Sequence, residues 1–594
     1  VVGLSVGFMA ERYAKILVSA QGSYAADLFR SDKVLALDSG NYPAGTIVQY
    51  TTNHNAAVVT AVVASENSAL AVIWNALSEN GIDPEFPPQV SEEVGNIVRA
   101  PGIDQADLAD LTHLPFITID NVDSRDLDQA MHIGVSDDEF VLHYALADAA
   151  HFVRPGSALF AEALQRGASF YVPGFAVPML PRELSEDLVS LNEGVTRRAL
   201  VFVMRFDQLG NVLDTSVQQA RIVSAAKLSY QGVEEYYRTG ELSDLAGRPF
   251  TPTLDYLREF GRLRIEQARR RNVVEYDRSS VEISLSNDGE TFQLIDTERL
   301  MVEKYNEQVS LVCNGEGARL LSEAGLTSLV QAVYRVHEAP DAERLSKFSR
   351  LLKGLIKRYQ LDPKMWVWRW RDGRYGPKEN LSDYLQRLKD NHADKHLLAA
   401  VQRHALMLSP ASRFTAVAGG HYSLKLDQYA RFSSPMREIA GIFTHREYLQ
   451  ISGQVPDTVL DDQIFQEKVI DAANRSKEKQ KRLNKAVMKK AIDQLFEHQL
   501  DLPSQQQVRF TGTVMSLRST RVYVRLDQTS ISVKIYLREL SKHTGQDYHL
   551  DRSTAFIECA DNVVFTLGQR ITLQVHGYTE DKQRWHLLPV VGDN

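Results

Sequence analysis

The chain has 594 residues, of which 44% are hydrophobic and 24% charged, and its formal net charge at pH 7 is -9. These values are ordinary for a soluble globular protein and predict roughly three to five domains with at least one large core. The negative charge does not favour a nucleic-acid partner, although a basic channel can lie inside an acidic protein.

Cys313 and Cys559 are the only cysteines and lie far apart in the sequence. This spacing argues against a disulfide framework or a zinc site and fits a reducing cytoplasm, where we expect the protein to act. Because no apolar run reaches about 18 residues, we expect no transmembrane segment. The apolar residues 1–10 lack the basic start of a signal peptide, and the missing initial Met suggests a processed or trimmed N-terminus.

Residues 1–67 are predicted to form a small N-terminal α/β module. A helical pattern runs from Ala10 to Phe29, and strand-like runs follow at 45–50 and 56–63. The segment 53–55 between these runs contains a hairpin signal. A winged helix and a small β-barrel that contains a helix both fit, and the module is a candidate for RNA binding.

Residues 68–112 are predicted to be a helical linker with breaks at Asp83-Pro84 and Pro87-Pro88. Residues 113–460 mix strands and helices and form the largest predicted unit. Within it we expect strands at 140–146, 200–206 and 293–295, a basic helix at 257–271 and a nearly all-helical stretch at 342–407.

Residues 461–505 are predicted to be a basic helical connection. A solvated face is the usual interpretation of such a charge run, and contact with a phosphate backbone is the alternative. Residues 506–594 alternate apolar and polar side chains in several short strands. This pattern favours a small OB barrel, a fold that commonly binds oligonucleotides.

Three carboxylates, Asp120, Asp126 and Asp128, lie within nine residues directly after an apolar, β-branched run. Crowded carboxylates repel one another unless a cation lies between them. Hard oxygen ligands at this density suit Mg²⁺ or Mn²⁺ and therefore phosphate chemistry. The alternative is an acidic turn after a strand, which would also account for Asp123.

Two further segments contain distinctive residues. Residues 171–185 read YVPGFAVPMLPRELS, and residues 433–437 read SSPMR and are followed by His445-Arg446. With the acidic segment 118–128, they resemble, in order, the TID-then-DxDDA, YLPG-PMLPRELS and TSPIR-HR motifs of the ribonuclease II (RNB) family of 3′-to-5′ exoribonucleases. The resemblance covers about residues 90–460, and three motifs in order are far more specific than one.

The resemblance implies an α+β multidomain protein with a large mixed α/β RNB catalytic domain at 113–460. It also implies an S1-like OB β-barrel at 506–594. The N-terminus departs from the family pattern, because ribonuclease II and RNase R usually begin with two cold-shock OB domains. The 67 residues present here are too few for two barrels.

The resemblance also implies that Asp120, Asp126 and Asp128 bind metal, with Asp126 and Asp128 catalytic. Gln129 stands in place of the fourth family acid at the metal site. Three carboxylates and one substrate phosphate can still balance two divalent cations. We therefore expect activity to persist at a higher metal requirement.

Arg437 matches the family arginine that neutralises charge near the scissile phosphate, and a structural ion pair is the alternative. The family often has Tyr two places and Asp four places after this arginine, where this chain has Ile439 and Gly441. His421 and His445 lie within or beside the same motif. Each is a candidate general base, but a hydrogen-bonded structural role is the expected one.

Four residues are expected to bind RNA. Tyr171 and Tyr276 occupy positions where family members place rings that stack on the 3′-terminal bases, and core packing is the alternative for both. Tyr230 matches a KLxY tyrosine. Glu303 corresponds to a glutamate that contacts the terminal sugar, whose 2′-hydroxyl distinguishes RNA from DNA, and a surface helix acid is its alternative.

The resemblance thus implies a monomeric, Mg²⁺-dependent exoribonuclease that hydrolyses single-stranded RNA processively to nucleoside 5′-monophosphates, with Mn²⁺ as a substitute. Two metal ions would activate water and stabilise the leaving oxygen. Two alternatives remain, an RNA-binding adaptor with a weakened site, supported by Gln129, and a phosphoesterase that acts on something other than RNA.

Overall fold

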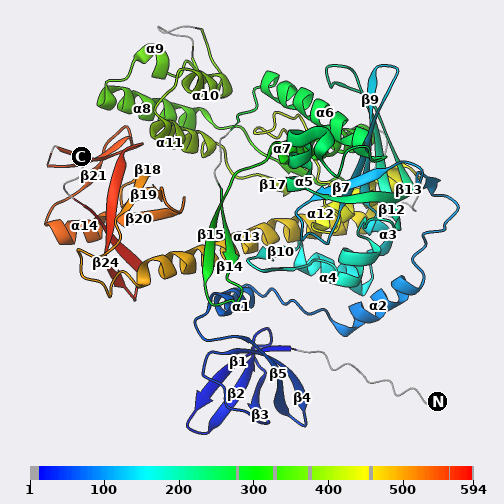
Figure 1. The fold of residues 1–594 in the computed structure, drawn as a ribbon, viewed down its shortest axis with the longest axis horizontal. Helices are drawn as coiled ribbons and strands as arrows, with labels where there is room; N and C mark the ends of the chain where they lie inside the picture. Colours follow the sequence, from blue (N-terminus) through cyan, green and yellow to red (C-terminus); the bar gives the residue numbers. More distant parts are fainter. Residues whose placement is uncertain are drawn as a thin grey trace.

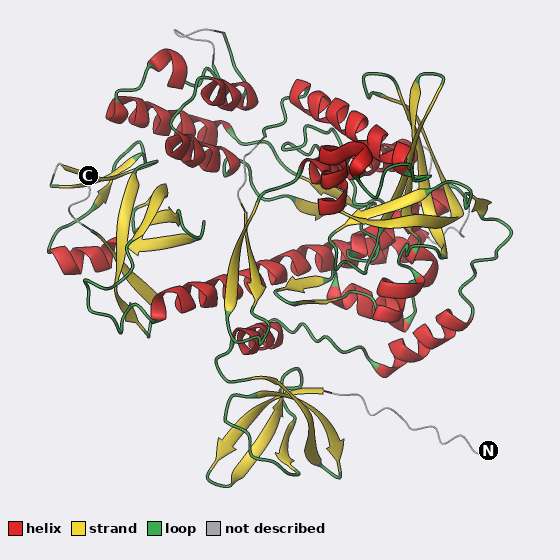
Figure 2. Ribbon diagram, viewed as in Figure 1, coloured by secondary structure: helices red, strands yellow, loops and turns green. Residues whose placement is uncertain are grey.

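The computed structural model describes residues 12–275, 280–325, 331–371, 377–453, 459–560 and 562–590. Figures 1 and 2 show a small β unit near the N-terminus, a large central body, a group of helices and a second β-rich unit near the C-terminus. The long helix α13 (Val459–Glu497) runs from the body to the C-terminal unit. This arrangement is the predicted class, a multidomain α+β fold.

The N-terminal unit is a closed five-stranded barrel with the order β1-β2-β3-β5-β4. The predicted hairpin is confirmed as the antiparallel β4–β5 pair, and His54 and Asn55 have positive φ in its turn. The structure therefore has a barrel and not a winged helix. The strands are β1 (Arg12–Ser19), β2 (Gly22–Asp27), β3 (Val34–Leu37), β4 (Ile47–Asn53) and β5 (Ala56–Ala64).

The helix predicted from Ala10 to Phe29 is wrong, because the described part of this segment forms the β1–β2 hairpin. Ala14 and Ile16 are both fully buried, as alternate residues of a strand that faces a core. β1 also pairs with β4 and so closes the barrel. A pairing with residues more than 30 positions away overrides the local helical pattern, which a short apolar run cannot exclude.

Two helices follow the barrel, α1 (Ala69–Glu79) and α2 (Pro88–Arg99). Ser68 caps α1, because its hydroxyl accepts a hydrogen bond from Ala71 N at 3.0 Å. Pro88 begins α2, where a residue without an N–H is tolerated. The helical linker is therefore interrupted at the predicted prolines.

A six-stranded mixed sheet with the order β12-β9-β8-β7-β13-β6 forms the centre of the body. Successive residues of its strands face opposite cores, so that Phe116 packs on one side and Ile117 on the other. Both faces are covered by helices, which explains the long apolar runs of these strands. The strands are β6 (Ala109–Asp110), β7 (Phe116–Asp120), β8 (Gln129–Ser136), β9 (Glu139–Ala147), β12 (Thr196–Phe206) and β13 (Val212–Ser229).

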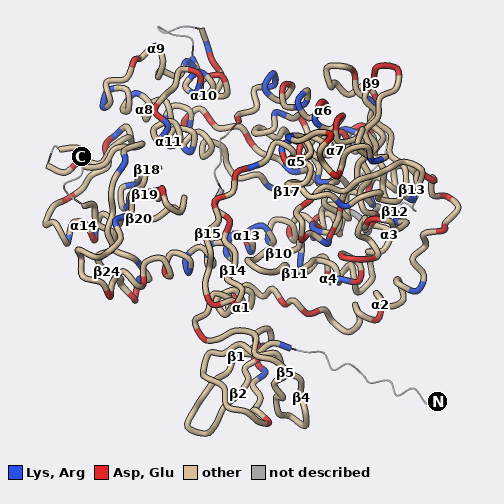
Figure 3. Tube along the Cα trace, viewed as in Figure 1, with Lys and Arg blue, Asp and Glu red and all other residues tan. Residues whose placement is uncertain are grey.

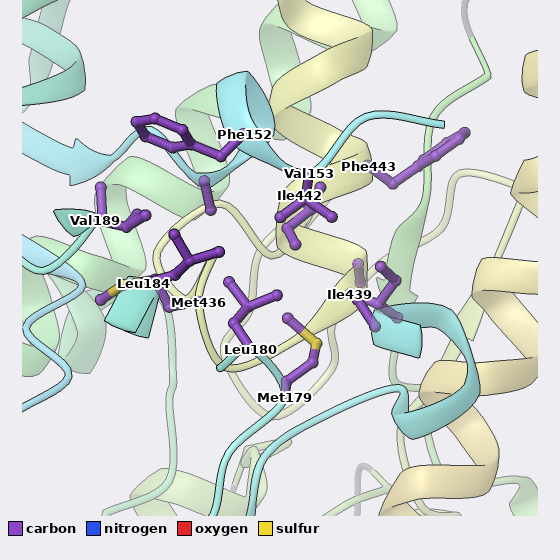
Figure 4. Close-up of a cluster of buried hydrophobic side chains, with 14 of the residues drawn as sticks. Phe152, Val153, Met179, Leu180, Leu184, Val189, Met436, Ile439, Ile442 and Phe443 are labelled. Atoms are coloured by element: carbon purple, nitrogen blue, oxygen red, sulfur yellow. The ribbon is translucent and has the colours of Figure 1, made fainter. Parts of the chain in front are cut away.

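Different helices cover the two faces of this sheet. The core on the Phe116 side contains residues of α2, α3 (Ala149–Phe152), α4 (Ala158–Arg166), α12 (Ile439–Ile451) and α13. Figure 4 shows part of this core, where Met179 and Leu180 lie near Met436 and Ile439. The opposite core contains residues of α5 (Tyr230–Thr239), α6 (Thr251–Arg270) and α7 (Met301–Ala324).

The basic side chains of α13 mostly contact the protein itself. Lys477 Nζ donates to Ser412 O at 2.5 Å, and Arg482 Nε donates to Asn80 Oδ1 at 2.8 Å. Lys479 Nζ reaches Gly81 O at 3.3 Å. These cations attach α13 to the end of α1 and to the body. This structural role differs from both predicted roles of the charge run, a solvated face and contact with a phosphate backbone.

The C-terminal unit contains a five-stranded sheet with the order β20-β19-β18-β24-β25 and a three-stranded sheet, β21-β22-β23. It shares an apolar core with the helical group, α8 (Ala342–Tyr359), α9 (Pro363–Trp366), α10 (Leu381–Asp390) and α11 (Lys395–Leu406). The strands are β18 (Phe510–Arg518), β19 (Arg521–Leu526), β20 (Ser532–Tyr536), β21 (His549–Leu550), β22 (Phe556–Cys559), β23 (Asn562–Thr566), β24 (Arg570–Thr579) and β25 (Arg584–Pro589), with α14 (Leu537–Thr544) between β20 and β21.

Cys313 and Cys559 are both free and buried. Among the helices of the described ranges, none combines the length and the apolar character that crossing a membrane requires.

Trp74 of α1 joins the barrel to the body, because its ring stacks on Tyr13 of β1 and on Phe175, with centroids 4.1 and 5.6 Å apart. We expect Trp74→Ala to weaken this attachment by about 3–5 kcal/mol, the usual cost of removing a buried aromatic ring. Limited proteolysis should then cut the chain between the barrel and α2 much faster. Val62→Ala, at an exposed barrel position, is the control, and equal cleavage rates for the two variants would contradict this role.

Candidate active site

The acidic segment lies between two neighbouring strands of the central sheet. β7 ends at Asp120 and β8 begins at Gln129. Ser190 holds the loop between them, because its Oγ accepts from Leu127 N at 3.0 Å and donates to Arg125 O at 2.7 Å. The loop is thus fixed by a residue from a distant segment.

The segment 431–437 is the second part of the site, and Asn314 of α7 holds it in place. The Asn314 Oδ1 atom accepts hydrogen bonds from Phe432 N at 2.8 Å and from Ser433 N at 3.0 Å. Its Nδ2 atom donates to Ser433 Oγ at 2.9 Å and to Tyr429 Oη at 3.0 Å. Asn314 is fully buried, so all of its polar atoms serve this segment.

Gly441 explains one departure from the family pattern. A Cβ atom at this position of α12 would lie 2.9 Å from Pro435 Cα and 2.9 Å from Ser434 O. The Asp that the family often has at this position would therefore not fit. Glycine allows α12 to pack directly against the backbone that precedes Arg437.

Asp128 and Arg437 bring the two parts together. The Arg437 Nε atom donates to Asp128 Oδ2, and Met436 N donates to Asp128 Oδ1 at 2.7 Å. Asp128 is only 2% exposed, whereas about a third of the Arg437 side chain is exposed. The guanidinium thus connects a buried carboxylate to the open side of the site.

Burial dominates the electrostatics of these acids. Burial raises the pKa of Asp128 to about 6, although Arg437 and the N–H of Met436 oppose the rise. Burial also raises the pKa of Asp126, where Arg437 again opposes the effect and the charge of Asp120 adds to it. The charge of Asp126 likewise adds to the rise in the pKa of Asp128, so neighbouring acids of this segment disfavour ionisation of Asp126 and Asp128.

Gln129 contributes a contact that an acid could not make. Its Nε2 atom donates to the carbonyl oxygen of Ser433. An ionised carboxylate accepts hydrogen bonds only, so the family acid would place two acceptors opposite each other. Gln129 therefore holds the segment of Arg437 from the β8 side.

Tyr171 of β10 (Phe170–Val172) reaches the site from a third direction. Its hydroxyl donates to Asp126 Oδ2 at 3.1 Å, and 46% of the residue remains exposed. Its backbone is held by Gln480 of α13, which accepts from Tyr171 N at 3.0 Å and donates to Tyr171 O at 2.8 Å. The ring is positioned beside the acids and is accessible.

A polar cleft of about 240 Å³ lies next to Arg437. Tyr230 begins α5 on one wall, and its hydroxyl accepts from Asn306 Nδ2 at 3.1 Å. Glu303 also lines the cleft, but its Oε2 atom accepts from Leu300 N at 2.5 Å and so caps α7. The lining residues are Gln129, Tyr230, Arg299, Glu303, Asn306, Glu307, Ser310, Arg431, Ser433, Ser434 and Arg437.

The lining of this cleft includes none of Asp123, His421 and His445. Tyr276 is outside the described residues. Asp123 is exposed in the acidic loop. Burial lowers the pKa of His421 to about 3 and that of His445 to about 4, so both rings are neutral at neutral pH. His445 Nε2 bonds to Phe432 O at 2.9 Å, which is the expected structural role.

The donor set fits Mg²⁺ in chemical kind, because three carboxylates and an amide oxygen are hard ligands. The donors are not preassembled as a cage. Within the described residues no group of three or more His, Cys, Asp or Glu side chains is placed to hold a metal ion. Both oxygens of Asp128 are instead engaged by Arg437 and Met436.

The sequence model of the RNB domain family matches residues 108–452, which is more than half of the chain. The chain belongs to the RNB domain family. The predicted resemblance is therefore confirmed, and the sheet of β6–β9, β12 and β13 with both halves of the site lies inside the matched range.

Curated relatives agree with this assignment. The chain is 25% identical to ribonuclease R of Thermotoga maritima over 501 residues, 83% of this chain and 66% of that protein. It is 28% identical to ribonuclease R of Vibrio cholerae over 375 residues, 62% and 43% of the two chains. The chain thus spans less than two thirds of these relatives.

The fold is also that of Mycoplasma genitalium RNase R solved in complex with ribose-methylated single-stranded RNA. The TM-score is 0.78 and the identity 20%, with 99% of this RNB chain and 91% of that chain covered. The likeness extends beyond the RNB domain, because it covers 99% of this chain.

Three residues that hold the site together, Asn314, Ser190 and Gln480, were not predicted from the sequence. Asn314 carried a usable signal, since it is a polar residue in the apolar series Val309, Val312 and Cys313 of one helix. Ser190 and Gln480 carried no such signal, because their partners come from segments far away in the sequence.

The raised pKa of Asp128 predicts a specific pH dependence of stability. The native state retains this proton up to about pH 6, whereas an unfolded Asp loses it near pH 4, so stability falls as pH rises between these values. Relative to the wild type, we expect the free energy of unfolding of Asp128→Asn to rise by up to about 3 kcal/mol between pH 4 and pH 6. The difference between the two proteins should stay constant above pH 6.

Local unfolding free energies from hydrogen exchange of peptides in β8 and β9 measure this difference. Asp123→Asn, an exposed acid of the same loop, is the control and should show no such slope. A constant difference between the Asp128→Asn variant and the wild type from pH 4 to 7 would contradict the assignment.

Proposed function

We propose that this RNB protein is a hydrolytic exoribonuclease that degrades single-stranded RNA from the 3′ end, processively, to nucleoside 5′-monophosphates. The observation that carries the proposal is the Asp128–Arg437 pair, which joins two family motifs 309 residues apart at one polar cleft. The names of the relatives, ribonuclease R, and the RNA in the Mycoplasma structure support this choice of reaction and substrate.

The cleft beside the pair suits a phosphodiester. Arg299, Arg431 and Arg437 line it, and a guanidinium recognises phosphate oxygens through two parallel hydrogen bonds. Arg431 is already paired with Glu438 at 3.0 Å and Arg299 with Glu307 at 3.0 Å. We therefore assign Arg437, whose partner Asp128 can be exchanged for substrate, to the charge that develops on the scissile phosphate.

We propose that Asp120, Asp126, Asp128 and Gln129 would hold two Mg²⁺ ions, for which Mn²⁺ can substitute. When bound, such ions supply charge neutralisation at the phosphate and lower the pKa of water. In this chain Asp128 must release Arg437 to serve as a ligand, and the released guanidinium becomes available to the phosphate. The same exchange would remove the cost of ionising Asp128 in a buried site.

RNA would be held by rings and by its sugar. The accessible ring of Tyr171 beside Asp126 can stack on a terminal base, a contact of about 1–3 kcal/mol that does not depend on base identity. Tyr230 and Glu303 line the cleft, where the hydroxyl and the remaining carboxylate oxygen can meet a 2′-hydroxyl. We further propose that the protein acts as a monomer in the cytoplasm.

The central prediction concerns hydrolysis itself. With Mg²⁺ the wild type should convert 5′-labelled homopolymer RNA to short end products without a ladder of intermediates, and EDTA should stop the reaction. Asp128→Asn should slow it by at least roughly 100-fold, because a charge in direct contact with the reacting groups is lost. Asp123→Asn, in the same loop but exposed, should keep the wild-type rate.

A DNA oligomer of the same sequence should resist hydrolysis. If the wild type instead shifts RNA in a gel and leaves it whole, the protein is an RNA-binding adaptor, the alternative that Gln129 and the engaged Asp128 favour.

Gln129 predicts an unusual metal requirement. The wild type should need more Mg²⁺ for half-maximal rate than Gln129→Asp, because the variant restores a fourth negative charge at the metal site. The variant should also lose the hydrogen bond to Ser433 O. The free energy of local unfolding of this segment should therefore fall by about 1–2 kcal/mol. Initial rates over a Mg²⁺ titration, with hydrogen exchange of segment 431–437, test both effects. Saturation of the wild type at trace Mg²⁺ would count against this role.

A further inference from the structure

A second cleft, of about 430 Å³, lies between the helical group and the C-terminal unit, away from the residues of the candidate active site. Its walls are α8 and α11 on one side and β18 with the turn after β21 on the other. Figure 1 labels these elements. The lining residues are Arg344, Lys347, Phe348, Arg350, Leu351, His404, Met407, Leu408, Leu517, Arg518, Leu550, Arg552, Ser553 and Thr554.

The charge of this cleft is one-sided in a chain whose net charge is negative. Four arginines and one lysine line it, and none of its lining residues is Asp or Glu. Figure 3 marks the basic positions of α8 and β18 in blue. Like charges that gather without acids destabilise a surface unless an anion meets them.

Three of these cations have no partner among the residues that the structure describes. Arg344 is paired with Asp341 at 3.5 Å and Lys347 with Glu343 at 2.7 Å. Within the described ranges, Arg350, Arg518 and Arg552 form no side-chain hydrogen bond or ion pair, and all three are exposed. They come from three different elements, so their convergence is a property of the tertiary structure.

The bottom of the cleft differs from its rim. Phe348, Leu351 and Leu517 are buried there and form an apolar floor. His404 adds a polar atom, because its Nε2 is buried without a hydrogen-bond partner. An apolar floor, an unpartnered imidazole nitrogen and a cationic rim together suit a ligand that carries both flat apolar groups and phosphates.

The walls are held rigidly against each other. A Cβ atom at Gly354 of α8 would lie 2.7 Å from Ser553 Cβ and 2.9 Å from Ala555 Cβ, so only glycine allows this approach. Asp551 fixes the same turn by accepting hydrogen bonds from Ser553 N at 2.7 Å and Ala555 N at 2.9 Å. Tyr359 Oη donates to Leu567 O at 3.1 Å across the interface. The elements that carry the cations are therefore held in fixed positions relative to one another.

We infer that this basic cleft binds the sugar-phosphate backbone of an RNA strand, outside the site where hydrolysis is proposed. The inference rests on the proposed function for its choice of nucleic acid. The exposed position of Arg350, Arg518 and Arg552 on the rim suits a strand that continues beyond the cleft. A free mononucleotide or phosphate shares the same chemistry and is the alternative source of the anion.

The test compares two double variants, Arg518→Gln with Arg552→Gln in the cleft and Arg238→Gln with Arg262→Gln as the control. All four side chains are exposed, so both proteins should fold, which their thermal unfolding curves check. Binding of a 5′-labelled oligonucleotide is measured in EDTA as a function of salt. Loss of two phosphate contacts should lower the slope of log K against log salt by about 1.4, and the control should match the wild type.

A second measurement places the RNA. Acetylation of Lys347, which lines the cleft, should slow when RNA is bound, whereas Lys357 on the same helix should react as before. AMP and inorganic phosphate at the same phosphate concentration should give no such protection. Protection by either one equal to that by RNA would overturn the assignment to a strand.

The outcomes separate this inference from the proposed function. Hydrolysis of a trinucleotide should be unchanged in the cleft variant, because so short a substrate needs only the candidate active site. If the wild type hydrolyses RNA and the cleft variant has the same slope of log K against log salt as the wild type, only the inference about the cleft is overturned. If the wild type hydrolyses no RNA and the slope is reduced in the cleft variant, the proposed function is overturned and RNA binding in the cleft is supported.

Discussion

The contact between Asp128 and Arg437 is the interaction on which the candidate site depends. A carboxylate that is almost fully buried is costly, and here that cost is only partly offset by one guanidinium and one backbone N–H. The part of this cost that is not offset raises the pKa of Asp128. A site that holds an acid in this condition is prepared to accept further positive charge, which is what a phosphodiester hydrolase needs.

The rest of the RNB domain keeps this pair in position. The acids lie where β7 ends and β8 begins, at one end of the two middle strands of the central sheet, and an apolar core packs on each face of that sheet. Asn314, Gln129 and Gly441 approach the segment of Arg437 from three different elements. Each acts through the backbone of that segment, so the arginine can change partners while its support stays fixed.

Gln129 and Gly441 show how two departures from the family motifs form one consistent arrangement. The amide of Gln129 replaces a repulsion with a hydrogen bond to Ser433, and the glycine removes a side chain that would collide with Pro435. Gln129 holds the segment of Arg437 to β8, and Gly441 allows its close contact with α12. The chain has one carboxylate fewer than its family pattern, and Arg437 balances part of the remaining negative charge by pairing with Asp128.

The sequence by itself determined the family and the class of the fold, and it predicted which chemical groups the site contains. The acids, Arg437 and the RNB motifs could be read directly, because their residue types and spacing are local properties of the chain. Strands such as β9 and β12 were predictable from their apolar runs for the same reason. The hairpin at His54 and Asn55 was likewise predictable from its turn residues.

Only the tertiary structure decided what lies opposite each of these residues. The local pattern from Ala10 to Phe29 predicts a helix, but β1 in this segment pairs with β4. The sequence alone does not show that Glu303 caps α7. The basic cleft at Arg518 and Arg552 has no signal in the sequence, because its cations come from separate elements. Local patterns encode which groups a segment offers, whereas burial, pairing and charge balance depend on partners that folding brings from hundreds of residues away.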